Sequence, residues 1–315
     1  MATEQPKVSK AFNGIPETWE EWVRAAKKLQ VSRKSIHSRK EIASGSKISQ
    51  EEYLLLKAIW ETNEDTDISG LALGSHLASA RQSLGQNLPF QAFIRGIRDV
   101  AAGNRPNVSE MGIFQIPFTQ MQEVLHLSNL SAPKRPGKSD PKAKRETRLR
   151  HQINEDIVNT AAISLLTAIT VGSVEGAVWS PHRAPLYANF KRASMEAQID
   201  GYLSVGLLSQ TSLILEAKAR KRAAHEPAVS MQETAEMVAW LMAKPPSDGP
   251  EWYITEGKYT PEYREHILGE RRTLAKDNFL VMKRFGPWRS DRPYKIQELC
   301  EVVFALVQRA VAEER

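Results

Sequence analysis

Two segments with the alternating pattern of β-strands, between residues 196 and 219, constrain the fold of this 315-residue chain more than any other feature. In the first segment apolar residues alternate with polar ones from Asp200 onward, and in the second Glu216 and Lys218 alternate with apolar residues. The apolar positions are Ile199, Gly201, Leu203 and Val205, then Leu213, Leu215, Ala217 and Ala219. Paired as a hairpin through residues 206–210, the segments would place both carboxylates and the Lys218 ammonium on one face.

Helices and further strands are predicted around this hairpin. Apolar residues at helical spacing predict a helix over residues 151–170, and a second helix over 231–243 is stopped by two prolines. Strands are expected near residues 251–255 and 278–285, and a closing helix over 295–312. This order predicts an α/β fold, with a small mixed sheet flanked by helices.

Residues 1–131 predict a helical accessory region. Helices are expected near residues 16–28, 50–62, 75–84 and 90–102, and no strand pattern precedes residue 130. A helix-turn-helix reader of DNA is an alternative, although nothing in the pattern identifies a recognition helix.

The segment 132–150 is strongly basic and broken by proline. Eight Lys and Arg residues against two acidic residues give it a net charge of +6, which equals that of the whole chain. Its prolines and glycine predict a linker or an exposed arm without regular structure through most of its length. Such a segment is typical of a nuclear localisation signal, of a phosphate-contacting arm or of a plain solvated linker. The candidate nucleic-acid contacts here are Lys134, Arg135, Lys142, Lys144 and Arg145.

Several classes of protein are excluded or disfavoured. A single cysteine, Cys300, excludes an internal disulfide framework and a multi-cysteine zinc site, and its apolar neighbours predict a core position. The chain has no phosphate-binding Gly-rich loop, no dinucleotide fingerprint and no nucleophile elbow. Neither a signal peptide nor a bilayer-length apolar run is visible, so we expect an intracellular protein without a membrane partner.

Asp200, Glu216 and Lys218 together predict hydrolytic chemistry. Two carboxylates on neighbouring strands repel each other unless a cation lies between them, and a hard divalent ion such as Mg²⁺ or Mn²⁺ takes oxygen ligands. A lysine beside the metal can position a water and offset charge in the transition state. The structural alternative is a surface hairpin with a Glu–Lys pair worth under about 1 kcal/mol.

The order of these residues resembles the motif of the PD-(D/E)XK nuclease superfamily. The matching runs are Asp200-Gly201-Tyr202-Leu203 and Ile214-Leu215-Glu216-Ala217-Lys218, with Ile199 where the family name has proline. The acidic helix residue before the strands is Glu155 or Asp156, and Gln232 opens the following helix. The runs Trp179-Ser180-Pro181-His182-Arg183 and Phe285-Gly286-Pro287-Trp288 are similar to those of fungal proteins with a nuclease-like domain.

The resemblance covers roughly residues 150–312, and it implies a nuclease-like domain over residues 151–315 with a restriction-endonuclease-like core. It implies that Asp200 and Glu216, with the carbonyl of Ala217, ligate Mg²⁺ or Mn²⁺ and that Lys218 orients the attacking water. Gln232 would hold the lysine, the water or the nucleic-acid backbone, and Glu155 would support the metal or the lysine. Ser230 and Glu233 offer a simpler reading of the Gln232 region, as a capping box at the start of a helix.

Three functions remain open from the sequence. The first is a metal-dependent nuclease acting on phosphodiester bonds, with DNA favoured over RNA and with Arg183 and Arg220 as further nucleic-acid contacts. The second is a catalytically inactive nuclease-like module that binds nucleic acid or protein. The third is a helical scaffold, which would be favoured if Asp200, Glu216 and Lys218 lay far apart. In a nuclease, the basic segment would hold phosphate close to the metal site; otherwise a nuclear import signal or a plain linker is the expected use of its charge.

Overall fold

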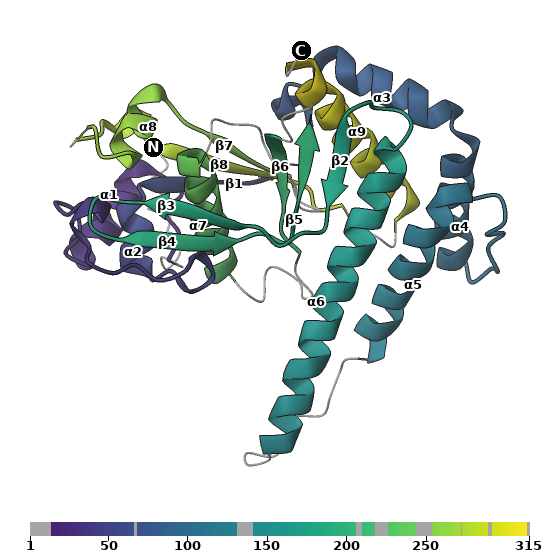
Figure 1. Cartoon of the computed structure of the whole chain (residues 1–315), viewed down its shortest axis with the longest axis horizontal. Coiled ribbons are helices and arrows are strands. Elements are labelled where there is room, and N and C mark those ends of the chain that lie inside the picture. Colours follow the sequence, from purple (N-terminus) through teal and green to yellow (C-terminus); the bar gives the residue numbers. More distant parts are fainter. Residues whose placement is uncertain are drawn as a thin grey trace, which may run out of the picture.

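The computed structural model describes residues 14–65, 68–130, 141–205, 210–217, 226–243, 254–271, 273–288 and 292–313. Side chains are described for these residues except 62–65, 128–130, 141–155, 210–212 and 243. The chain is a mixed α/β protein (Figure 1).

The helices are α1 (Trp19–Lys28), α2 (Gln50–Leu55), α3 (Gly74–Gln86), α4 (Leu88–Ala101), α5 (Gln115–Leu130), α6 (Pro141–Thr170), α7 (Ala228–Ala243), α8 (Pro261–Ile267) and α9 (Pro293–Glu313). The strands are β1 (Ala58–Asp65), β2 (Ala177–Ser180), β3 (Pro185–Asn189), β4 (Ser194–Gln198), β5 (Gly201–Val205), β6 (Gln210–Leu215), β7 (Ile254–Lys258) and β8 (Leu280–Phe285). Short 3₁₀ turns cover Ile36–Ser38, Gly45–Lys47, Ile68–Leu71, Gly112–Phe114 and Lys276–Asn278.

The predicted hairpin is confirmed as the antiparallel pair β5–β6. Leu203 lies opposite Leu213 and Gly201 opposite Leu215, and β2 pairs with the other edge of β5. The first predicted strand is divided in the structure, because β4 ends at Gln198 and pairs with β3 in a separate two-stranded sheet. Asp200 lies in the bend between β4 and β5.

The third sheet has the order β1-β8-β7, with β1 parallel and β7 antiparallel to β8. Strand β1 overturns two predictions: a helix over residues 50–62 and the lack of any strand before residue 130. Helix α2 ends at Leu55, and Lys57 has a positive φ of 54° that turns the chain into β1. The misreading has a physical cause, because a short apolar run fits a buried strand and a helix equally well until its pairing partner is known.

The long helix α6 corrects a third prediction, that of an irregular basic segment. Its first residue is Pro141, so residues 141–150 of the basic segment are helical and not an irregular linker. Proline lacks the N–H that a first helical residue leaves unused, and it therefore begins a helix here instead of breaking one. Helices α5 and α6 run side by side (Figure 1).

Two hydrophobic cores form, and each includes residues of the β5–β6 hairpin. The α9 core surrounds the apolar face of α9 and includes Leu203 and Leu213 from one face of the hairpin. The α7 core surrounds α7 and includes Ile214 from the other face. The hairpin is therefore buried on the face of Leu203 and Leu213, and the half-buried face with Tyr202 and Ile214 borders α7.

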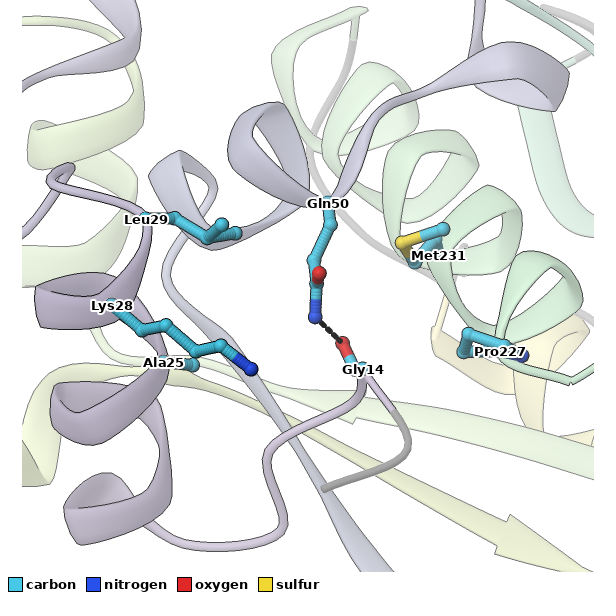
Figure 2. A pocket seen from close by; sticks show the side chains of 7 residues that line it. All are labelled: Gly14, Ala25, Lys28, Leu29, Gln50, Pro227 and Met231. Atoms are coloured by element: carbon cyan, nitrogen blue, oxygen red, sulfur yellow. Dashed lines mark hydrogen bonds between the residues drawn. The ribbon is translucent and has the colours of Figure 1, made fainter. Parts of the chain in front are cut away.

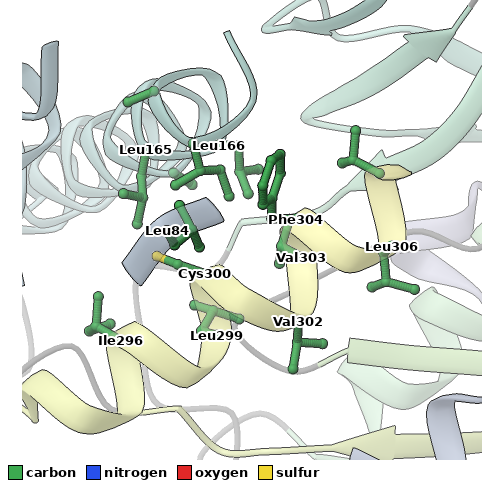
Figure 3. Close-up of a cluster of buried hydrophobic side chains, with 14 of the residues drawn as sticks. Leu84, Leu165, Leu166, Ile296, Leu299, Cys300, Val302, Val303, Phe304 and Leu306 are labelled. Carbon is green, nitrogen blue, oxygen red and sulfur yellow. The ribbon is translucent and has the colours of Figure 1, made fainter. Parts of the chain in front are cut away.

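Both cores combine residues from before and after the basic segment. Phe93 and Phe118 belong to the α9 core, and Trp22 and Trp60 belong to the α7 core. Cys300 packs in the α9 core, as its sequence context predicted (Figure 3). The packing thus does not separate residues 1–131 from the rest of the chain as an independent accessory region.

Candidate functional site

Asp200 and Glu216 meet where β5 begins and β6 ends. The Asp200 N–H donates to the Leu215 carbonyl oxygen at 2.9 Å, next to the pairing of Gly201 with Leu215. Continuing this register places Asp200 opposite Glu216, and opposite residues of an antiparallel pair project to the same face. Both carboxylates therefore lie on the hairpin face that borders α7. The sequence predicted that Asp200 and Glu216 share a face, and the third member of that set, Lys218, lies outside the described residues.

Backbone contacts fix Asp200 from two directions. The Ala217 N–H donates to Asp200 Oδ2 at 2.8 Å, which holds the carboxylate over the end of β6. On the opposite side, Asn159 of α6 donates from Nδ2 to the Asp200 carbonyl oxygen at 2.9 Å. Asn159 is only 7% exposed, so this hydrogen bond ties α6 to the bend before β5 in a buried position.

Gly201 permits this bend to approach its neighbours. A Cβ atom at this position would lie 2.7 Å from the Ser180 carbonyl oxygen and 2.9 Å from Ile163 Cδ1. Contacts this short do not occur for real Cβ atoms, so β2 and α6 require a glycine here. The glycine that follows Asp200 is therefore a packing requirement of the site.

Glu216 is held by α7. Gln232 donates from Nε2 to Glu216 Oε1 at 2.8 Å and to Glu236 Oε1 at 2.7 Å. Glu216 is 9% exposed and Glu236 is 2% exposed, so one amide group joins two buried carboxylates. Gln232 and Glu236 are four residues apart on α7 and thus share one helical face.

Arg183 joins the hairpin to α6. Its Nε lies 3.2 Å from Asp200 Oδ1, and its Nη2 lies 2.6 Å from Asp156 Oδ1. The sequence prediction made Arg183 a nucleic-acid contact, and the structure has its guanidinium between two carboxylates of the protein. Of the two acidic candidates on α6, Asp156 is linked to Asp200 through Arg183, and the side chain of Glu155 lies outside the described residues.

The predicted capping box at Ser230 is wrong. Helix α7 begins at Ala228, so Ser230 lies inside its first turn. The Ser230 hydroxyl donates to Glu226 at 2.8 Å and accepts from Arg284 Nη2 at 3.0 Å. The Arg284 guanidinium also lies 4.6 Å from the centre of the Trp60 ring, within the range of a cation–π contact. This network ties the start of α7, which presents Gln232, to β8 and β1.

The remaining predicted residues lie outside the described parts of the structure. Lys218, Arg220, Lys134 and Arg135 fall in segments that are not described. Glu155, Lys142, Lys144 and Arg145 lie in the described backbone of α6, but their side chains are not described. Their predicted roles therefore stay predictions.

Two residues of the site were missed from the sequence: Asn159 and Glu236. Asn159 follows Asp156 by three positions and faces the apolar side of α6, and a polar residue on an apolar stripe is a signal of a buried hydrogen bond. Glu236 follows Gln232 by four positions, a spacing that allows side chains to pair along a helix. Neither signal identifies a site residue from the sequence alone, because the sequence does not show which face of each helix points toward the hairpin.

A separate hollow of about 370 Å³ lies between α1, α2 and the start of α7 (Figure 2). It is lined by Gly14, Ala25, Lys28, Leu29, Gln50, Pro227 and Met231. Gln50 donates from Nε2 to the Gly14 carbonyl oxygen at 3.3 Å across this hollow. It shares no residue with the Asp200–Glu216 site.

The ligand types at Asp200 and Glu216 fit a hard divalent cation. Mg²⁺ is usually bound by one or two carboxylates together with waters and substrate phosphates, and Mn²⁺ accepts the same oxygen ligands. Two carboxylates on one face, with the Ala217 carbonyl in the same stretch of chain, supply such a set. In the described parts of the chain, no cluster of three His, Cys, Asp or Glu side chains is arranged to bind a metal.

Comparisons with models of protein families, with curated proteins and with solved structures found no match. In the parts of the chain that are described, no helix is both long and apolar enough to cross a bilayer. A functional assignment consequently depends on the geometry of the site and on its sequence motif.

Proposed function

We propose that the protein is a metal-dependent nuclease of the PD-(D/E)XK type, which hydrolyses phosphodiester bonds of nucleic acid. The observation that carries the proposal is the pairing of Asp200 and Glu216 at one end of the hairpin, with Gln232 of the next helix bonded to Glu216. A restriction-endonuclease-like core has this arrangement, in which helix, hairpin and helix surround two carboxylates.

Each residue has a definite task in this proposal. Asp200 and Glu216, with the Ala217 carbonyl, hold the divalent cation. When bound, Mg²⁺ supplies charge that polarises a phosphoryl oxygen and lowers the pKa of a water. Lys218 follows Glu216 by two residues in the sequence motif and lies outside the described residues; in this proposal it orients the attacking water and offsets negative charge.

Gln232 and Asn159 act as positioning residues. Gln232 limits Glu216 to one orientation through the hydrogen bond to Oε1, and Glu236 limits Gln232 in turn. Asn159 holds the backbone of Asp200 through its carbonyl oxygen. A preorganised set of this kind lowers the cost of assembling the site when substrate binds.

The basic segment supports a nucleic-acid substrate. Lys142, Lys144 and Arg145 belong to α6, and the same helix continues to Asp156 and Asn159 at the site. At 1.5 Å per residue, about 16 Å of helix separates Arg145 from Asp156. Phosphates bound along this part of α6 would lie within about one helical turn of DNA from the site. DNA is the favoured substrate. The same basic residues also fit a nuclear import signal.

Cleavage assays with the full chain test the proposal. Labelled single- and double-stranded DNA and RNA are incubated with Mg²⁺, with Mn²⁺ or with EDTA. We expect cleavage only with a divalent cation, and a loss of about a hundredfold or more in Asp200→Asn, Glu216→Gln and Lys218→Ala. Glu196→Gln, on the exposed side of β4, is the matched control. Equal cleavage by the wild type and the three variants would rule out this site.

A nuclease-like module that binds without cutting is the second candidate. The observation that favours it is that both oxygens of Asp200 already have protein partners, Arg183 and the Ala217 N–H. If this candidate is correct, no substrate is cleaved, yet the affinity for DNA falls steeply with salt. Changing Lys142, Lys144 and Arg145 to Gln would then reduce the log–log salt slope by about 0.9 for each phosphate that is no longer neutralised. A flat salt dependence would exclude a nucleic-acid partner.

A further inference from the structure

Arg183 has a position that the proposed chemistry leaves unexplained. It lies in the short connection between β2 and β3, outside any helix or strand, and its side chain is 40% exposed. The guanidinium bridges Asp200, whose side chain is 13% exposed, and Asp156, whose side chain is 54% exposed. The contact with Asp200 thus lies within the site, and the contact with Asp156 faces solvent.

Charge explains what this bridge does in the metal-free chain. Asp200 and Glu216 share one face, and two carboxylates so placed repel each other in the absence of a cation. The Arg183 guanidinium lies 3.2 Å from Asp200 Oδ1 and supplies positive charge at that carboxylate. A planar guanidinium is suited to this task because its N–H groups can engage two carboxylates at once.

A divalent cation on Asp200 changes this balance. It would add two positive charges beside the guanidinium, and like charges at this separation repel. Because Asp200 Oδ2 accepts the Ala217 N–H, a cation held by this carboxylate would compete with the guanidinium for Oδ1. A guanidinium released from Asp200 would keep a partner in Asp156 and would lie beside the bound substrate, where phosphate oxygens offer acceptors of the right geometry.

We propose that Arg183 is an internal counter-ion, which holds Asp200 while the divalent cation is absent and transfers to a phosphate of the substrate when the cation binds. This inference deepens the proposed function and rests on it for the metal and the substrate class. It makes Arg183 both a competitor of the metal and a sensor of its presence.

Titration calorimetry of Mn²⁺ into the full chain tests the first half. Arg183→Gln removes the competing charge and keeps a polar side chain, so its Kd for Mn²⁺ is expected to fall by about threefold or more. Arg183→Lys keeps the charge and should bind Mn²⁺ like the wild type. Arg192→Gln, in the exposed β3–β4 turn, is the control for a general change of charge. If Arg183→Gln binds Mn²⁺ as tightly as the wild type or more weakly, the proposal is overturned. It is also overturned if Asp200→Asn binds Mn²⁺ as tightly as the wild type.

Salt-dependent binding of a labelled DNA duplex tests the second half. In EDTA, Arg183 is engaged by carboxylates, so Arg183→Gln and the wild type should have the same salt slope. In Ca²⁺, which takes the same oxygen ligands, the wild type should neutralise one further phosphate, and the variant should have a slope smaller by about 0.9. Equal slopes in Ca²⁺ overturn the transfer.

The two proposals fail in different ways. If Arg183→Gln binds Mn²⁺ more tightly and has the smaller salt slope in Ca²⁺ but no substrate is cut, the nuclease assignment fails while the counter-ion role stands. If cleavage depends on Asp200 and Glu216 but the Mn²⁺ affinity does not respond to Arg183→Gln, the counter-ion role alone fails.

Discussion

At the scale of single residues, the site depends on a close approach of the backbone at Gly201 and on buried side chains that hold Asp200 and Glu216. Gly201 allows the bend at Asp200 to contact β2 and α6. Asn159 donates a hydrogen bond to the backbone carbonyl oxygen of Asp200, and Gln232 donates one to the Glu216 carboxylate. Elsewhere, His266 is a buried histidine. Its Nδ1 lies 3.1 Å from the Arg271 carbonyl oxygen, which fixes Nδ1 as the protonated nitrogen of the neutral ring.

The first prediction concerns Gly201→Ala. The added methyl would meet the Ser180 carbonyl oxygen at 2.7 Å, and overpacking of this kind costs about 1–3 kcal/mol of the free energy of unfolding. The control is Gly85→Ala on the exposed side of α3, where a Cβ meets nothing within 4 Å. This change should leave stability equal or raise it by about 0.5–1 kcal/mol. Urea unfolding measures both, and equal stabilities of the two variants would contradict the required close approach.

The second prediction concerns the pH dependence of stability. Burial, with the nearby charge of Lys57, lowers the pKa of His266 to about 4 from its usual 6.5. The unfolded chain therefore takes up this proton near pH 6.5 while the folded chain does not. Stability from this group is present above pH 6.5 and is lost as the pH falls toward 4, by about 3 kcal/mol.

Unfolding between pH 7.5 and 4.5 in the wild type and in His266→Gln measures this effect. The variant should have a shallower decline of the free energy of unfolding, whatever its absolute stability. His182→Gln, at an exposed position, should follow the wild type. Parallel curves for the wild type and His266→Gln would contradict the assignment.

At the scale of elements, capping and pairing define where helices and strands begin. Helix α2 has a complete capping box, in which Ser49 accepts from the Glu52 N–H and Glu52 accepts from the Ser49 N–H. Ser44 precedes the short 3₁₀ turn Gly45–Lys47 and makes no side-chain cap hydrogen bond. Helix α2 then leads directly into β1, so its capped start helps to position that strand against β8.

These two serines give a matched pair of variants for the third prediction. Ser49→Ala should lower the free energy of unfolding by about 0.5–2 kcal/mol, because the cap of α2 is lost. Ser44→Ala should change it by less than about 0.5 kcal/mol. Thermal or urea unfolding provides the comparison. Equal destabilisation by the two substitutions would show that the capping box does not stabilise α2.

At the scale of the whole molecule, the two cores depend on segments that are distant in sequence. The α9 core needs α3 and α4, and the α7 core needs α1, α2 and β1. Net charge has a different distribution, since the +6 of the chain equals the net charge of residues 132–150. The fold is therefore continuous across this segment, whereas the excess of positive charge is confined to it.

The fourth prediction follows from the shared cores. A fragment of residues 132–315 should fail to fold on its own, because it lacks β1 and the apolar faces of α3 and α4. Circular dichroism should detect no cooperative thermal transition for the fragment, in contrast with the full chain. Addition of residues 1–131 as a separate peptide should restore some structure if the interface is complementary. A cooperative transition in the fragment alone, at the melting temperature of the full chain, would contradict the shared cores.

The sequence by itself determined the local features of this protein. Period-two alternation identified the hairpin and the shared face of Asp200 and Glu216, and apolar periodicity identified α6, α7 and α9, because these patterns depend only on neighbouring residues. The tertiary structure alone decided that β1 is a strand and that Arg183 lies between Asp156 and Asp200. Each of these depends on a partner distant in the chain or on a helix rotation, and local periodicity contains neither.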